Sequence, residues 1–140
     1  EIPYISSTAL NNGVDNFIGN IEKVRKSDND LTLANSGSVG ACFCHNYEYI
    51  ASDHVTSLKL PNGSDTVYKF ISVILGRLEE KYSFNREIND TRIKREKILL
   101  PIDKDGNPNW FYMENFIKNI EQKQIKNILK YLDEYIYIYI

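Results

Sequence analysis

The chain has 140 residues, of which 42% are hydrophobic and 26% charged, which suits one soluble globular domain and is too short for two ordinary ones. Its 17 basic and 19 acidic residues give a formal net charge of −2, which argues against a general polyanion-binding protein. No run of about 18 apolar residues occurs, so the sequence predicts no membrane-spanning helix and no membrane partner.

Short strands separated by turns are expected over the first part of the chain. The sequence starts at Glu1 with an apparent strand in progress, so we expect a longer parent polypeptide. Asparagine and glycine at residues 11–13 and 35–38 indicate turns, because both residue types tolerate positive φ. The expected strands comprise residues 3–6, 16–18, 31–34, 39–44, 47–51 and 55–60, with a loop over residues 20–30 that holds at most a helical turn.

The centre of the chain contains one clear amphipathic helix. A Pro-Asn-Gly turn at residues 61–63 ends the preceding strand, and Ser64 or Asp65 can cap the helix. Apolar residues at helical spacing predict a stripe that packs on the core. The stripe consists of Val67, Phe70, Ile71, Ile74, Leu75 and Leu78.

A second and longer helix is expected near the C-terminus. Before it, Asp90 is expected to cap a helical turn that ends at Lys94, and residues 97–102 to form a strand. A tight turn at residues 103–108 follows, with Pro108 suited to the first turn of the helix. The helix then extends from about Asn109 to residues 131–135.

The apolar face of this C-terminal helix exceeds what a small sheet can cover, so its distal half is expected to pair with another helix. The face comprises Trp110, Met113, Phe116, Ile117, Ile120, Ile125, Ile128, Leu129 and Leu132. Of these, Met113, Ile117, Ile120, Ile125, Ile128 and Leu132 are the candidates for contact with a partner or a second copy. Residues 135–140 alternate as a strand does, yet they equally fit a continuation of the helix.

A polar segment at residues 81–94 combines aromatic, amide and basic side chains. Six basic residues lie between Lys81 and Lys97, against the three acidic residues Glu87, Asp90 and Glu96. Arginine and lysine neutralise phosphates or bind guanine, and asparagine pairs bidentately with adenine. The segment therefore indicates selective contact with nucleic acid, although a solvated loop has the same composition.

An enzyme is the rival class, because Cys42, Cys44, His45, Asp53 and His54 offer ligands and nucleophiles. Zinc sites favour two to four residues between paired cysteines, and here one residue separates them. On a strand, His45 would point away from both thiols, so core-packed thiols are favoured over a metal or Cys/His site. Two close cysteines also form no disulfide framework, which fits a reducing, cytoplasmic setting. No glycine-rich methyltransferase motif and no acidic nuclease cluster with an adjacent lysine is evident.

Several segments, in their order and spacing, resemble one known family over roughly residues 2–130. They are residues 1–7 with 11–14, residues 36–41 with 50–55, residues 84–89 with Ile98-Leu99-Leu100-Pro101, and residues 103–110 with Met113, Glu114 and Ile117. These segments resemble the target-recognition domains of restriction–modification systems, found in type I DNA-specificity subunits and in type IIG enzymes. The chain departs from the family pattern by lacking an N-terminal strand region and a second recognition domain, and by having Asn85-Arg86-Glu87 where relatives often have Gly-Arg-Lys.

The resemblance implies an α+β fold, with a bent, mostly antiparallel sheet and a packed helix, followed by a long C-terminal spacer helix. It implies an N-terminally incomplete DNA-recognition domain at residues 1–107 and a connecting or dimerisation helix at residues 108–140. Such a protein reads one half-site of double-stranded DNA without cofactor or catalysis of its own. Its partners are methyltransferase and restriction subunits, with a homodimer through the helix as a further option. A fused type IIG enzyme and a protein-interaction module without DNA remain the alternatives.

Three regions are the candidates for DNA contact. The first is the loop after the first strand, the second is the glycine turn, and the third is the polar segment, in which Arg92 and Lys94 are the candidate phosphate contacts. The candidate residues are Ser6, Ser7, Thr8, Asn11, Asn12, Ser36, Ser38, Lys81, Tyr82, Ser83, Asn85, Arg86, Asn89, Arg92 and Lys94.

Overall fold

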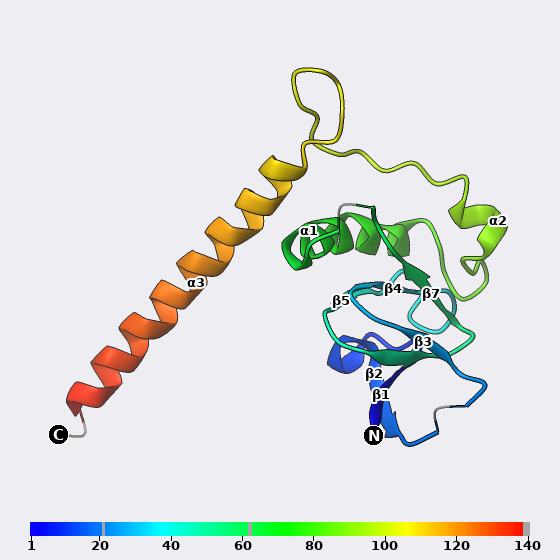
Figure 1. Cartoon of the computed structure of the whole chain (residues 1–140), viewed down its shortest axis with the longest axis horizontal. Helices are drawn as coiled ribbons and strands as arrows, with labels where there is room; N and C mark the ends of the chain where they lie inside the picture. The colour runs from blue at the N-terminus through cyan, green and yellow to red at the C-terminus, as the bar shows by residue number, and fades with distance from the viewer. Residues whose placement is uncertain (21, 62, 139–140) are drawn as a thin grey trace.

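The computed structural model describes residues 1–20, 22–61 and 63–138, and a long helix projects from its globular part (Figure 1). Strands and helices both build the globular part, which confirms the expected α+β class. In chain order the elements are β1 (Ile2–Ile5), η1 (Leu10–Gly13), β2 (Val14–Ile18), β3 (Arg25–Ser27), β4 (Asp30–Ala34), β5 (Cys42–His45), β6 (Tyr49–Ala51), β7 (Val55–Leu58), α1 (Asp65–Gly76), η2 (Arg77–Glu80), α2 (Asp90–Ile93) and α3 (Trp110–Ile138), where η denotes a 3₁₀ helix.

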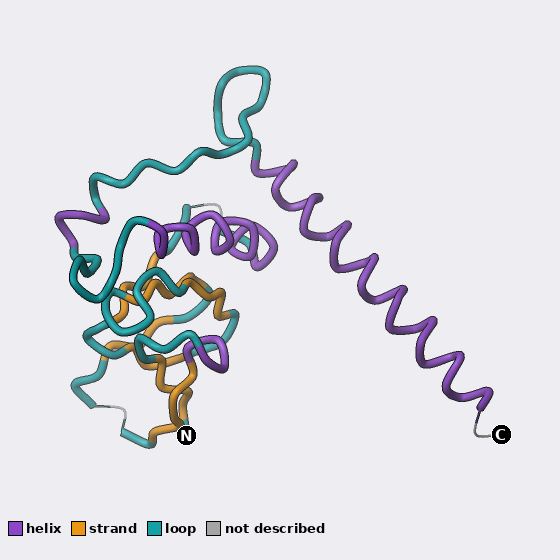
Figure 2. The backbone as a smooth tube through the Cα atoms, turned by 180° about the vertical axis from the view of Figure 1, so that it is seen from behind, coloured by secondary structure: helices purple, strands orange, loops and turns teal. Residues whose placement is uncertain are grey.

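The strands, drawn in orange in Figure 2, are divided between two small sheets. One sheet has the order β2-β1-β6-β3, and the other has the order β5-β4-β7. Among the described residues only β1 and β6 pair in parallel, so the expected, mostly antiparallel character is confirmed. Strands β6 and β7 follow each other in the chain yet belong to different sheets, which brings the two sheets together at residues 52–54.

A buried polar network crosses between the two sheets. The Tyr49 hydroxyl on β6 donates to Asp30 at the start of β4 over 2.8 Å and lies 2.8 Å from the Ser57 hydroxyl on β7. The Ser27 hydroxyl also donates to Asp30. Burial of a carboxylate is costly unless hydrogen-bond donors surround it. The hydroxyl groups of this network therefore allow Asp30 to lie inside the protein.

Helix α1 covers the sheet of β5, β4 and β7 (Figure 1). Ser64 caps it by accepting a hydrogen bond of 3.3 Å from the Val67 amide, as one of the two predicted alternatives had it. Four residues of the predicted stripe, Val67, Ile71, Leu75 and Leu78, form the main core together with Leu31, Leu33 and Met113. Phe70 is partly buried against this core, and Ile74 lines a groove at its edge. Periodicity and capping therefore place this helix as the sequence predicts.

The long helix α3 packs on α1 only through its first turns. Met113 is fully buried, and the Phe70 and Phe116 rings meet edge to face with centroids 5.7 Å apart. Lys69 on α1 lies 2.7 Å from Glu121 and 2.6 Å from Asp65, and these hydrogen bonds raise its pKa. The docked part of α3 thus fixes the direction in which the rest of the helix leaves the globular part.

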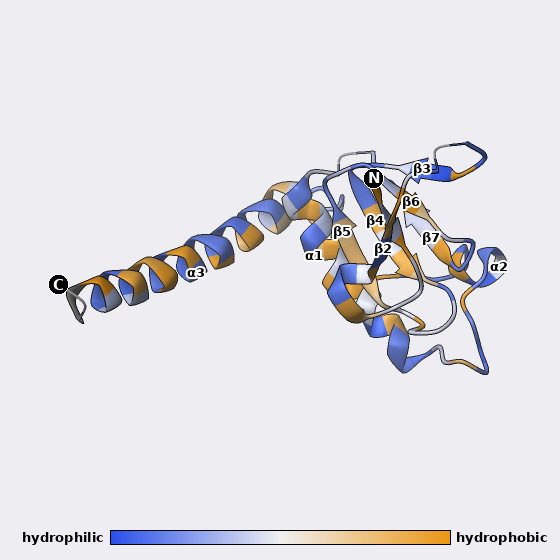
Figure 3. Ribbon diagram, turned by 90° about the horizontal axis from the view of Figure 1, so that it is seen from below, coloured by the Kyte–Doolittle hydropathy of each residue, from blue (hydrophilic) through white to orange (hydrophobic). Residues whose placement is uncertain are grey.

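Beyond that contact, α3 keeps a hydrophobic stripe in solvent (Figure 3). Ile125, Ile128 and Leu132 are 55%, 57% and 47% exposed. Residues 135–138 continue the helix rather than forming a strand, and residues 139–140 of the predicted alternation lie outside the described residues. None of the described helices is long and apolar enough to cross a membrane.

The sequence-based prediction of a loop over residues 20–30 is wrong in part, because β3 and the first residue of β4 lie there. Strand β3 consists of Arg25, Lys26 and Ser27 at the edge of its sheet and pairs with β6 through its backbone. Charged edge strands are common in proteins, yet they lack the apolar alternation that identifies a strand in a sequence.

The strand expected at residues 97–102 is also wrong. These residues run in an extended loop between α2 and α3, and within them only Ile102 forms a bridge, to Pro108 (Figure 2). Leu99 is 93% exposed, so the apolar composition of this segment does not mark burial in a sheet.

The starts of α2 and α3 differ from the prediction by one residue each, and α3 continues to Ile138, beyond the end expected at residues 131–135. Asn89, rather than Asp90, caps α2 by accepting from the Arg92 amide over 2.9 Å. Asn109 accepts from the Tyr112 amide over 2.9 Å, so Pro108 lies just before α3 rather than inside its first turn. Both caps are asparagines, which cap helices as well as aspartate does.

Candidate nucleic-acid interface

The first predicted region forms a tight loop between β1 and β2. Asn11, Asn12 and Gly13 all have positive φ, at 49°, 55° and 81°. The Ser6 amide donates to the Gly13 carbonyl over 3.0 Å and closes the loop. The side chains of Asn11 and Asn12 are exposed at its surface and make no hydrogen bond with the described residues. Their amides are therefore presented to solvent on a defined backbone.

The second region, the turn at residues 35–40, lies directly against that loop. The Ser38 amide donates to the Ser7 carbonyl over 2.9 Å, and the Ala9 amide donates to the Ser38 hydroxyl over 3.1 Å. At Gly37, whose φ is +56°, an added Cβ would lie 2.7 Å from the Ser7 carbonyl oxygen. Glycine is thus required for this approach of the two loops.

The third region is joined to the same turn by its backbone. The Ile88 amide donates to the Asn35 carbonyl over 3.0 Å. At Gly40, with φ +91°, an added Cβ would lie 2.6 Å from the Glu79 amide nitrogen in η2. All three regions proposed from the sequence therefore meet around the turn at residues 35–40, although they are far apart in the chain.

Within the third region, residues 83–86 form a tight two-residue turn. The Ser83 amide donates to the Arg86 carbonyl over 3.3 Å, and the Arg86 amide donates back over 2.8 Å. Phe84 and Asn85 occupy the tip of the turn and are exposed. Asn85 makes no hydrogen bond with the described residues, so its amide is available to a ligand.

Tyr82 is placed inside the protein, which removes it from an exposed contact surface. It is 4% exposed, and its hydroxyl donates to Glu96. This hydrogen bond and burial raise the pKa of Tyr82, while bonds from Lys81 and Tyr82 hold the pKa of Glu96 below its usual value. Lys81 is exposed but ion-paired with Glu96 at 2.7 Å, so part of its charge is already neutralised.

Other predicted residues also have partners inside the protein. The Thr8 hydroxyl accepts from the Leu10 amide over 3.2 Å, Ser36 is buried, and Arg92 donates to the Glu87 carbonyl. Asn89 is occupied as the cap of α2. These side chains shape the loops. The predicted residues with exposed side chains are Asn11, Asn12, Lys81, Ser83, Asn85, Arg86, Asn89 and Lys94.

Two apolar residues stand out at the tips of these polar loops and were not among the predicted contacts. Leu10 is 72% exposed in η1, and Phe84 is 76% exposed at the turn of residues 83–86. In the sequence, the signal that could have identified both residues is an apolar side chain inside an otherwise polar turn. Composition alone does not separate such a residue from an ordinary exposed one, since single exposed apolar side chains are common.

Cys44 and His45, central to the rival enzyme hypothesis, are each held by other partners in the structure. Cys44 faces α1, with its sulfur 3.5 Å from Oδ1 of Asp65, whereas both ring nitrogens of the buried His45 are hydrogen-bonded to Thr32 and Tyr47. Burial raises the pKa of both Cys42 and Cys44 to about 12, so the thiols stay protonated at neutral pH. In the part of the chain that the structure describes, no three such side chains are grouped to hold a metal.

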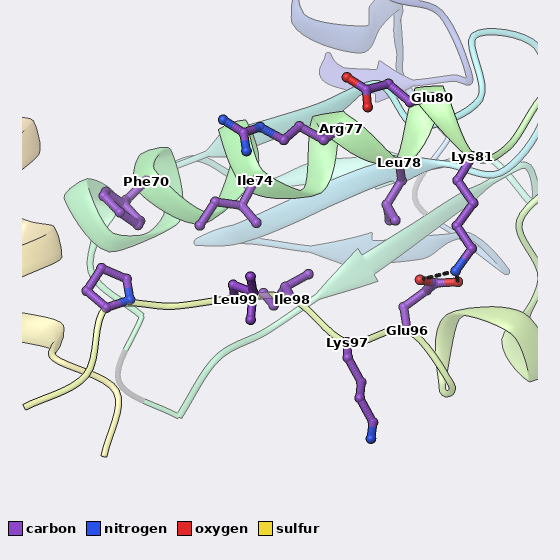
Figure 4. A pocket seen from close by; sticks show the side chains of 11 residues that line it. Phe70, Ile74, Arg77, Leu78, Glu80, Lys81, Glu96, Lys97, Ile98 and Leu99 are labelled. Atoms are coloured by element: carbon purple, nitrogen blue, oxygen red, sulfur yellow. Dashed lines mark hydrogen bonds and ion pairs between the residues drawn. The ribbon is translucent and has the colours of Figure 1, made fainter. Parts of the chain in front are cut away.

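A groove of about 770 Å³ lies between α1 with η2 and the extended segment at residues 96–101 (Figure 4). Phe70, Ile74 and Leu99 give it apolar walls, and the Lys81–Glu96 ion pair stands at one end. No serine, cysteine or histidine occurs among its lining residues. The groove therefore offers a packing surface rather than a nucleophile with a base.

Comparison with known proteins gives two matches. The sequence model of the family described as "Type I restriction modification DNA specificity domain" matches residues 1–134. The chain is also 34% identical over 127 residues to the specificity subunit S.BcgI of a type II restriction enzyme from Heyndrickxia coagulans. That match covers 89% of this chain and 37% of the relative, so the chain spans little more than a third of that protein's length. No solved structure is significantly similar.

Proposed function

The chain belongs to the family of type I restriction–modification DNA specificity domains, and we propose that it recognises a sequence in double-stranded DNA as the specificity component of such a system. The observation that carries this proposal is the meeting of three polar loops around the turn at residues 35–40. Together they present exposed amide and cationic side chains on one framework.

The exposed side chains divide into two chemical roles. The amides of Asn11, Asn12 and Asn85 can donate and accept at once, which suits the edges of bases. The cations of Arg86 and Lys94 suit phosphates and position the domain without reading sequence. Since the chain as a whole is acidic, contact is confined to this surface rather than spread over the protein.

We assign residues 1–107 to DNA recognition and residues 108–140 to connection. The docked turns of α3 hold the helix at a fixed angle, which supports a role as a spacer between one half-site and the rest of the complex. The exposed stripe of Ile125, Ile128 and Leu132 supports packing against another helix. We propose that a second copy or a corresponding helix of the parent chain covers it, and that methyltransferase and restriction subunits dock on the pair.

In this proposal the chain itself is non-catalytic and needs no cofactor. Methylation and cleavage reside in partner subunits or in another part of the parent polypeptide, and all of them act in the cytoplasm. The other partners of Cys44 and His45 and the lining of the groove between α1 and residues 96–101 support this assignment, because neither provides a reacting constellation.

Selection from a random duplex library tests the proposal. The chain, alone and with the methyltransferase of its own system, should enrich one half-site sequence. The Arg86→Ala/Lys94→Ala double variant should bind the enriched duplex more weakly, and its log Kd should depend on log salt with a slope smaller by about 2. The Lys104→Ala/Lys123→Ala variant, which removes two exposed cations outside the three loops, should match the wild type.

Absence of any enriched sequence in both settings would refute the proposal. A protein-interaction module without DNA binding would then be favoured, because the α3 stripe would remain as its contact surface. The sequence of the parent polypeptide distinguishes a separate subunit from a fused type IIG enzyme, because a fused enzyme carries its methyltransferase motifs in the same chain.

A further inference from the structure

Phe84 occupies an unusual place for a phenylalanine. It is 76% exposed at the tip of the turn at residues 83–86, between the polar side chains of Ser83 and Asn85. An exposed phenylalanine gives up the free energy that its burial would provide. Exposure alone does not assign a role to Phe84. A role in contact also requires that the turn hold the ring in a fixed position.

The turn is held firmly on both sides. Its two backbone hydrogen bonds join Ser83 and Arg86, and the buried residues Tyr82 and Ile88 anchor the chain before and after it. The Arg86 guanidinium lies over the Tyr82 ring, 5.5 Å from its centroid. An apolar side chain on such a support keeps its position when it is pressed against a stack of bases.

Cationic groups stand at the base of the turn. Arg86 is exposed, and the Lys81 ammonium lies 5.7 Å from the centroid of the same Tyr82 ring. Because Glu96 pairs with Lys81, Arg86 supplies most of the available charge. A protruding aromatic ring on a turn whose base carries cations fits a duplex, whose apolar base stack lies between two phosphate backbones.

We propose that Phe84 is a wedge that inserts against one base-pair step of the target and partly unstacks it. The inference rests on the proposed function and adds the mode of contact. Apolar side chains that enter base steps kink the duplex, and pyrimidine–purine steps open most easily. The target should therefore carry a TA, CA or TG step at one constant position, read through its deformability rather than through hydrogen bonds.

The experiment uses the whole chain and the duplex that the wild type enriches, with 2-aminopurine placed at each step in turn. Wild-type binding should raise the fluorescence at one step. Phe84→Ala should weaken binding by about 10- to 100-fold and abolish that rise, since stacking on an aromatic ring has this magnitude. Phe84→Leu, which keeps an apolar wedge, should retain part of both effects.

Phe111→Ala is the matched control, because Phe111 is 77% exposed and lies on α3, outside the three loops. It should change neither affinity nor fluorescence. Phe84→Asn, with a residue suited to turns, repeats the test should the alanine variant fold poorly.

An unchanged Kd with an unchanged fluorescence rise in Phe84→Ala or Phe84→Asn would overturn the wedge and leave sequence recognition intact. An enriched site without any constant flexible step would also overturn it. A wild type that enriches no sequence would defeat the proposed function and the wedge together, so the two failures are distinguishable.

Discussion

The Tyr49 hydroxyl donates a hydrogen bond of 2.8 Å to the Asp30 carboxylate, and this bond joins the two sheets of the protein. Both residues are buried, at 0% and 1% exposed. Burial raises the pKa of Tyr49, so its hydroxyl group stays protonated and remains a hydrogen-bond donor throughout the neutral range. The orientation of one sheet relative to the other thus depends on a polar bond as well as on apolar packing.

Tyr49→Phe should lower the free energy of unfolding by about 1.5–3 kcal/mol, because it removes a donor from a buried carboxylate. Chemical denaturation followed by circular dichroism measures the change. Tyr112→Phe is the control, since Tyr112 is 48% exposed on α3 and should be neutral within about 0.5 kcal/mol. Equal stability of the two variants would show that the bond between the sheets contributes nothing.

His45 should make the folded state sensitive to acid. Burial lowers the pKa of His45 from 6.5 to about 4, so the unfolded chain takes up a proton more readily than the folded one. The contribution is fully present above about pH 6.5 and is lost as the pH falls towards 4. The loss amounts to about 3 kcal/mol at most, at about 1.4 kcal/mol for each unit of pKa.

Unfolding measured between pH 6.5 and 5 tests this, because most carboxylates are still ionised there. His45→Gln should show a flatter dependence on pH than the wild type. His54→Gln is the matched control, since His54 is the other histidine and is exposed. If the stability of His45→Gln depended on pH as steeply as that of the wild type, His45 would not be the source of the acid sensitivity.

Gly40→Ala should be strongly destabilising for two reasons, the positive φ and the lack of space for a Cβ. Comparison with two other glycines separates these two effects. At Gly40 φ is +91° and an added Cβ would lie 2.6 Å from the Glu79 amide nitrogen, Gly106 has φ +83° in open space, and Gly76 has neither feature. We expect a loss of about 3 kcal/mol or more at Gly40, about 1–2 kcal/mol at Gly106, and no loss at Gly76.

Thermal and chemical unfolding of the three alanine variants give the order directly. Similar losses at Gly40 and Gly106 would mean that backbone conformation alone matters and that η2 yields to the added methyl group.

The two halves of α3 should respond differently to truncation of a side chain. Met113→Ala should lower the free energy of unfolding by about 2–5 kcal/mol, because Met113 is completely buried against α1. Ile128→Ala should change the stability of the isolated chain by less than about 0.5 kcal/mol, since Ile128 is 57% exposed.

Sedimentation completes this comparison. If the distal stripe pairs with another helix, Ile128→Ala should shift the distribution of the chain towards the monomer. A monomeric wild type, or an unchanged distribution in Ile128→Ala, would contradict pairing of the stripe with a second copy.

Local signals in the sequence predicted those parts of the fold that local chemistry decides. The Ser64 cap, the apolar stripe of α1 and the positive-φ turn at residues 11–13 all follow from neighbours in the chain. Strand β3 escaped prediction because its pairing is made by backbone groups, which the side chains of Arg25 and Lys26 do not reveal.

For the candidate interface, the regions were predictable and the individual side chains only partly so. Tyr82 and Asn89 have the chemistry of contact residues, yet a distant carboxylate in one case and a helix terminus in the other hold them in the structure. The cap made by Asn89 is a local contact with the Arg92 amide, whereas the partner of Tyr82 is set by the tertiary fold. The same holds for the meeting of the three loops, which depends on bonds between residues as far apart as Asn35 and Ile88.

The bonds that assemble these loops run from backbone to backbone, from Ser38 to the Ser7 carbonyl and from Ile88 to the Asn35 carbonyl. Exchange of the side chain at Asn85 or Lys94 leaves such bonds in place. Mutation can therefore alter what the loops bind while folding proceeds as before. A framework of this kind is suited to diversification under selection by changing targets. Gly37 and Gly40 are the exceptions, because an added side chain there would clash with the neighbouring backbone.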